Sequence, residues 1–230
     1  MTYRVLFIDE EKNAHGTFKR NFLKNNKERF TGSSIYPEAS LSNMMEVIFK
    51  ENPDAVLTDY SLNEYKTAIQ HEVEYDGGDL AKEIHARRQG FPVFITTSLG
   101  DDAARGGADV KIIYEKYGSL KEGERENSEP SADRQHLTFA DKLYHEIKAY
   151  KQFLEESSDE FDSLLIKRIS SESGLSIVEE ERLIELDGIL EDLIDRKSKI
   201  PEDLKIPSNA HRLEELLSLA KDILKKSNHE

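Results

Sequence analysis

The feature that most constrains the fold of this chain is a series of short apolar runs in its first half. Each run is nearly continuous in β-branched and aliphatic residues, and a helical or polar stretch separates it from the next. Parallel strands covered by helices on both faces have this pattern, so we predict a doubly wound sheet of five parallel strands. The clear runs lie at residues 4–8, 55–58, 92–97 and 111–114, with a weaker one near 33–36. The crossover helices are expected near residues 18–23, 41–50 and 78–88.

The second half of the chain has a different pattern. Residues 136–228 contain only helical patterns. Residues 118–135 combine Gly, Pro and Ser with almost no large apolar side chain, as linkers do. We therefore predict an α/β domain at residues 1–118, a linker at 119–135 and an all-α hairpin or bundle at 136–230.

Three amphipathic stretches are expected to form the helices of this tail. An apolar stripe runs from Phe139 to Leu154, a second helix begins at Ser176 with the capping box Ser-Ile-Val-Glu, and a third is expected at about 209–226. Leucines of the second helix recur at alternating three- and four-residue steps, as in a coiled-coil seam. We predict that two hairpins pair into a homodimer. The expected seam contains Leu143, Ile147, Leu154, Leu183, Leu186, Leu190 and Leu193.

The composition excludes several classes of protein. The chain has 32 Lys and Arg against 46 Asp and Glu, a net charge of −14, and the tail has no basic recognition helix, so no nucleic acid partner is expected. The absence of Cys excludes disulfides, thiolate metal sites and Cys nucleophiles. The chain lacks an apolar run of about 20 residues and a signal-peptide pattern, so we expect a cytoplasmic protein that does not enter a membrane.

Polar side chains that suit phosphoryl chemistry stand at the ends of the clear apolar runs. Asp9 and Glu10 follow the first run and Asp59 the second, while Thr97 ends the third and Lys116 lies just after the fourth. Ligands of doubly wound sheets bind at the carboxyl ends of the strands, so these five residues are expected to converge. Clustered carboxylates favour a hard cation such as Mg²⁺, and a phosphoryl group beside it would meet a hydroxyl and an ammonium. Each residue alone is an ordinary strand-end polar group, but together they indicate a phosphoryl site.

Five motifs follow one another in this part of the chain: Val5–Glu11, Pro53–Asp59, Asp76-Gly77-Gly78, Pro92–Ser98 and Gly107-Ala108-Asp109. In this order and spacing they resemble the receiver domain of two-component response regulators, which has a flavodoxin-like fold. The resemblance implies that Asp59 accepts a phosphoryl group from the phosphohistidine of a sensor histidine kinase or phosphotransfer protein.

The resemblance also implies roles for the other residues of the site. Asp9, Glu10 and Asp59 would hold Mg²⁺, Thr97 would be the switch hydroxyl, and Lys116 would sense the phosphoryl group. The protein would relay its state through the helical tail as a protein-binding module. It would have no independent catalytic activity beyond autocatalytic aspartyl phosphorylation and dephosphorylation.

Departures from the receiver pattern leave one alternative open. The step from Asp59 to Asp76 is long, so residues 63–74 look like an inserted loop. Tyr117 stands where the family has Pro, and Ile113 where it has the switch aromatic. The alternative is a pseudo-receiver that is not phosphorylated and acts as a scaffold or adaptor.

A second alternative rests on His145. The segment Phe139–Lys148 is similar to the phosphoacceptor box of histidine-kinase dimerisation domains, in which a Phe precedes the His by six residues. That resemblance implies a phosphorelay intermediate with His145 as phosphoacceptor. A surface histidine without this role is the plainer interpretation. No Gly-rich nucleotide-binding segment follows, so kinase activity is not expected.

Overall fold

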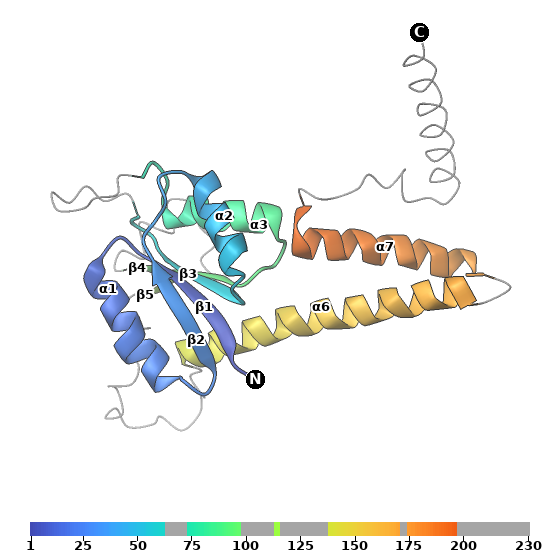
Figure 1. The fold of residues 1–230 in the computed structure, drawn as a ribbon, viewed down its shortest axis with the longest axis horizontal. Coiled ribbons are helices and arrows are strands. Elements are labelled where there is room, and N and C mark those ends of the chain that lie inside the picture. The colour runs from blue at the N-terminus through green and yellow to red at the C-terminus, as the bar shows by residue number, and fades with distance from the viewer. Residues whose placement is uncertain (63–72, 98–112, 116–137, 171–173, 197–230) are drawn as a thin grey trace, which may run out of the picture. The chain divides into compact units, whose positions relative to one another are not determined.

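The computed structural model describes residues 1–62, 73–97, 113–115, 138–170 and 174–196 (Figure 1). Contacts divide the chain into two compact units, Met1–Gln152 and Phe153–Glu230. The strands are β1 (Tyr3–Ile8), β2 (Phe30–Ile35), β3 (Ala55–Asp59), β4 (Val93–Thr97) and β5 (Ile113–Glu115). The helices are α1 (Lys12–Thr17), its continuation as the π-helix η1 (Phe18–Leu23), α2 (Leu41–Glu51), α3 (Gly77–Arg87), α6 (Phe139–Ser170) and α7 (Ile177–Ile194).

The strands form a parallel sheet in the order β2-β1-β3-β4, and the short β5 pairs with the free side of β4. The prediction of a parallel α/β sheet is thereby confirmed. Strand β2 lies on one side of β1 and β3 on the other, so the order of the strands reverses at β1. This reversal creates a switch point at the carboxyl ends of β1 and β3, where ligands of such sheets bind.

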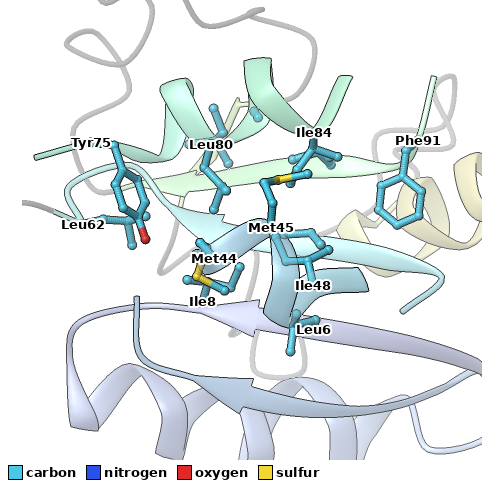
Figure 2. Close-up of a cluster of buried hydrophobic side chains, with 14 of the residues drawn as sticks. Leu6, Ile8, Met44, Met45, Ile48, Leu62, Tyr75, Leu80, Ile84 and Phe91 are labelled. Carbon is cyan, nitrogen blue, oxygen red and sulfur yellow. The ribbon is translucent and has the colours of Figure 1, made fainter. Parts of the chain in front are cut away.

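Helices cover both faces of the sheet, because the side chains of each strand alternate between two cores. In β1, Leu6 and Ile8 enter the first core, while Val5 and Phe7 enter the second. The first core, drawn in Figure 2, lies against α2 and α3. The second core lies against α1, η1 and the first part of α6. The sheet is therefore the middle layer of the first unit.

The first part of α6 belongs to the first unit. Phe139, Leu143 and Ile147 are buried in the second core. At the start of the helix, the Asp141 carboxylate accepts a hydrogen bond of 2.7 Å from the Thr138 hydroxyl and pairs with Arg29 at 2.5 Å. These two partners hold the pKa of Asp141 below its usual value. The helix thus begins at a capped end that is also bound to the residue preceding β2.

Further along, α6 lies at the amino-terminal ends of the strands. The ring of Tyr144 lies 5.3 Å from that of Tyr3, the first residue of β1. The Lys151 ammonium pairs at 2.5 Å with Asp54, which directly precedes β3. Both contacts are at the sheet edge opposite the switch point. In the first unit, α6 therefore contacts the edge that carries no candidate phosphoryl residue.

These contacts correct one prediction. Leu143 and Ile147 were expected in an exposed dimer seam, but both are fully buried against the sheet, and the first unit extends to Gln152. An apolar stripe at helical spacing shows that one face of a helix needs cover, but it does not show which surface covers it. The prediction that these two side chains contribute to a dimer seam is therefore wrong. Leu183, Leu186 and Leu193 of α7 are also buried within the single chain, whereas Leu154 and Leu190 are half-buried. Homodimerisation itself stays a prediction.

In the second unit, α7 packs against the second part of α6 as a hairpin. Arg182 donates hydrogen bonds of 2.9 and 2.7 Å to the two carboxylate oxygens of Glu160, and Lys167 pairs with Glu179. The predicted capping box at Ser176 is confirmed, because the Glu179 N–H donates to the Ser176 hydroxyl and the Ser176 N–H donates to the Glu179 carboxylate. The third helix predicted at 209–226 lies outside the described residues. Of the helices in the described ranges, none is long and apolar enough to cross a membrane.

Candidate functional site

The carboxylates of Asp9, Glu10 and Asp59 converge at the switch point. Asp9 and Glu10 directly follow β1, and Asp59 is the last residue of β3. One carboxylate oxygen of each lies within 4.8 Å of the others, and the residues are 0%, 5% and 4% exposed. The structure therefore brings together the three carboxylates that the sequence placed at this edge.

Three hydrogen bonds fix the backbone and side chain of Asp9. Its N–H donates to the Ile35 carbonyl of β2 at 3.3 Å, and its carbonyl accepts from Nε2 of His15 at 2.8 Å. Its Oδ1 accepts the Glu11 N–H at 2.7 Å. Partners from β2, α1 and the turn after β1 thus hold this residue in place. Sequence reasoning missed His15, although its position on the apolar stripe of Phe18 and Phe22 is an unusual place for an imidazole.

The start of α3 packs closely against the backbone of Asp59. The Gly77 N–H donates to the Tyr60 carbonyl at 2.8 Å, and a Cβ added to Gly77 would lie 2.0 Å from the Asp59 carbonyl oxygen. Only glycine permits this approach of the two backbones. Asp76, just before it, caps α3 by accepting the Asp79 N–H at 2.8 Å. The Asp-Gly-Gly motif therefore serves as both a helix start and a support for Asp59.

Thr97 lies at the same edge of the sheet. It is the last residue of β4, it is 2% exposed, and its neighbour Thr96 pairs in register with Asp59. Glu115 of β5 pairs with Thr97, so β5 brings the chain to this edge one residue before Lys116. Lys116 itself lies outside the described residues, as do residues 63–72 of the expected inserted loop.

The three carboxylates fit a Mg²⁺ ion by their chemistry and spacing. Carboxylate oxygens are the ligands this cation prefers, at about 2.0–2.1 Å, so two ligands on opposite sides of it are about 4 Å apart. The oxygens here lie within 4.8 Å of one another, a separation that small side-chain movements close. Like charges buried this close repel strongly, and a divalent cation offsets that repulsion.

His145 is not brought near this cluster. It is exposed on α6, next to Tyr144, which packs on Tyr3 at the start of β1. The strand from Tyr3 to Asp9 spans about 20 Å at roughly 3.3 Å per residue. His145 and the carboxylates therefore lie at opposite edges of the sheet.

Comparison with protein-family models and with curated proteins finds no match. Among solved structures, the chain is similar to the receiver domain of RstA from Klebsiella pneumoniae, with 22% identity over 49% of this chain and 83% of that one and a TM-score of 0.32. It is similar to the receiver domain of RcsB from Escherichia coli, with 17% identity over 53% and 87% of the two chains and a TM-score of 0.37.

A third similar structure is the anti-anti-sigma factor PhyR from Bartonella quintana, with 10% identity over 69% of this chain and 52% of that one and a TM-score of 0.41. The solved structures that the chain is similar to therefore include response regulator receiver domains.

Proposed function

We propose that the protein is a response-regulator-type signalling protein that accepts a phosphoryl group on Asp59 from a phosphohistidine. The donor would be a sensor histidine kinase or a phosphotransfer protein. The observation that carries the proposal is the burial of three carboxylates, with oxygens within 4.8 Å of one another, at the switch point of a parallel sheet. Ordinary strand-end acids lie in water, whereas buried clustered acids require a cation or a proton.

The transfer would proceed as an in-line displacement. A carboxylate oxygen of Asp59 bonds to phosphorus while the P–N bond of the phosphohistidine breaks, and the released imidazole takes a proton from water. Asp9, Glu10 and Asp59 would hold Mg²⁺, whose charge offsets that of the phosphoryl oxygens. Thr97 would donate its hydroxyl to one of these oxygens, and Lys116 would pair with another. The state of Asp59 would then be relayed to a protein partner of the helical tail.

Phosphorylation of Asp59 is the direct test. Incubation with Mg²⁺ and a small phosphodonor such as acetyl phosphate should raise the intact mass by one phosphoryl group, and Asp59→Ala should abolish the gain. Asp54→Asn is the matched control, because Asp54 is a carboxylate at the other end of β3 and pairs with Lys151. It should leave the gain unchanged. A wild-type protein that stays unmodified at saturating donor and Mg²⁺ would support the unphosphorylated scaffold instead.

Binding of Mg²⁺ to the folded state alone should raise thermal stability. Asp9→Asn should remove most of the rise, since it removes one anionic ligand. Without Mg²⁺ the same variant should melt above the wild type, because one of three repelling buried charges is gone. Melting curves with and without millimolar Mg²⁺ measure both effects. A wild-type melting temperature that does not change with Mg²⁺ would contradict the proposed Mg²⁺ site.

His145 remains a second candidate phosphoacceptor, because its imidazole is exposed to a partner. Its place at the edge opposite Asp59 rules out direct transfer between the two within one first unit. A phosphorelay through His145 would therefore require a second molecule. Phosphorylation that persists in Asp59→Ala and is lost in His145→Ala would favour this function.

A further inference from the structure

His15 is a buried polar residue that the proposed phosphoryl chemistry does not use. It is 8% exposed, and its Nε2 lies 2.8 Å from the Asp9 carbonyl oxygen. A carbonyl oxygen only accepts hydrogen bonds, so Nε2 carries the hydrogen of this bond. The imidazole packs against two aromatic rings, with centroid distances of 5.9 Å to Phe7 and 4.5 Å to Tyr36. The ring is thus fixed in the orientation that the hydrogen bond needs.

The bonded carbonyl controls the position of two candidate ligands. A peptide group is planar, so the direction of the Asp9 carbonyl also sets the direction of the Glu10 N–H and the start of the Glu10 backbone. The Asp9 N–H is fixed to β2 on one side of the residue. The bond from His15 fixes the other side, between Asp9 and Glu10. Loss of this bond removes one of the contacts that orient the peptide between the two residues.

We propose that His15 is a positioning residue for the cation site: through its bond to the Asp9 carbonyl it sets the placement of the Asp9 and Glu10 carboxylates, and so the affinity for Mg²⁺. This inference rests on the proposed function, because it assumes that the acidic cluster binds the cation. Partners that orient metal ligands typically contribute a factor of about 10–100 in metal affinity.

The chain contains a matched control for this contact. His85 of α3 also uses Nε2 to bond a carbonyl six residues away, that of Phe91, at 2.9 Å. Phe91 precedes β4 and so lies at the edge of the sheet without the carboxylates. Loss of either bond removes a similar contact between a histidine and the backbone, but only the His15 bond reaches the acidic cluster.

The test compares two variants of similar size in the full chain. His15→Gln keeps an amide donor near the position of Nε2, whereas His15→Met has no donor. Titration calorimetry with MgCl₂ should give a dissociation constant about 10–100-fold higher for His15→Met than for the wild type. His15→Gln should recover most of the affinity, and His85→Met should stay within about twofold of the wild type.

Three results would overturn the proposal. Equal affinities of folded His15→Met and wild type would leave His15 without a positioning role, and an equal loss in His85→Met would show a general effect of stability. If His15→Met does not fold by circular dichroism, His15→Leu replaces it in the comparison with His15→Gln. If the wild type does not bind Mg²⁺, both the proposed function and this inference are wrong. If the wild type binds Mg²⁺ and the variants bind it with the same affinity, this inference alone is wrong.

Discussion

A chain that ends at Gln135 should fail to fold, whereas a chain that ends at Gln152 should give a folded sheet unit. The difference arises because the first part of α6 completes the second core with Phe139, Leu143 and Ile147. Burial of three such side chains contributes on the order of 5–9 kcal/mol. Since a typical domain is stable by only about 5–15 kcal/mol, the shorter chain should lose most of its stability. Circular dichroism and thermal melting of the two truncated chains measure this result.

Point substitutions in α6 separate this effect from chain length. Leu143→Ala removes a fully buried side chain and should cost about 2–5 kcal/mol of unfolding free energy. His145→Ala, two residues along the same helix on its exposed side, should change stability by less than about 0.5 kcal/mol. Chemical denaturation of the full chain gives both values. Equal effects of the two substitutions, or a folded chain ending at Gln135, would show that α6 is dispensable to the sheet.

Gly77→Ala should both destabilise the first unit and prevent phosphorylation of Asp59. The added Cβ would lie 2.0 Å from the Asp59 carbonyl oxygen and 2.9 Å from its carbon, so one of the two backbones must move by about 1 Å. Overpacking against backbone atoms costs about 3 kcal/mol or more, the upper end of its usual range. The displacement acts on the residue that carries the nucleophile. Denaturation curves and the mass assay with acetyl phosphate measure the two effects.

Gly90→Ala is the control for this substitution. Gly90 has a φ of 70°, but a Cβ there would meet nothing within 4 Å. It should cost only the strain of a left-handed alanine, about 1–2 kcal/mol, and leave the mass gain unchanged. A Gly77→Ala protein that is phosphorylated like the wild type would show that the contact with Asp59 does not hold the nucleophile.

The sequence predicted those parts of the site that depend on where strands end. Asp9, Glu10 and Asp59 were placed together correctly, because the ends of apolar runs mark the edge of a parallel sheet. His15 could not be placed in this way, since its partner is a backbone carbonyl, which has no signature in the sequence. The role of Gly77 in supporting Asp59 also depends on an approach between two backbones. Local patterns do not encode such an approach.

For the fold as well, the features that local patterns determine were predicted, and those that depend on distant packing were not. The parallel sheet and the capping box at Ser176 follow from periodicity and from local hydrogen bonding, and both are confirmed. The surface that covers Leu143 and Ile147 was not predictable, because helical spacing looks the same whether a helix packs on a sheet or on a second helix. The boundary predicted at residues 119–135 lies outside the described residues and stays a prediction.

The attachment of α6 to the sheet also determines what a cut in the chain would do. Phe139 and its neighbours are held in the core, and Arg29 and Lys151 add ion pairs with Asp141 and Asp54. None of these contacts depends on the peptide bonds between 119 and 135. A protease that cleaves there would therefore leave two fragments that stay associated under native conditions and separate only in denaturant. Cleavage of the chain between the two predicted domains would therefore not by itself release the tail.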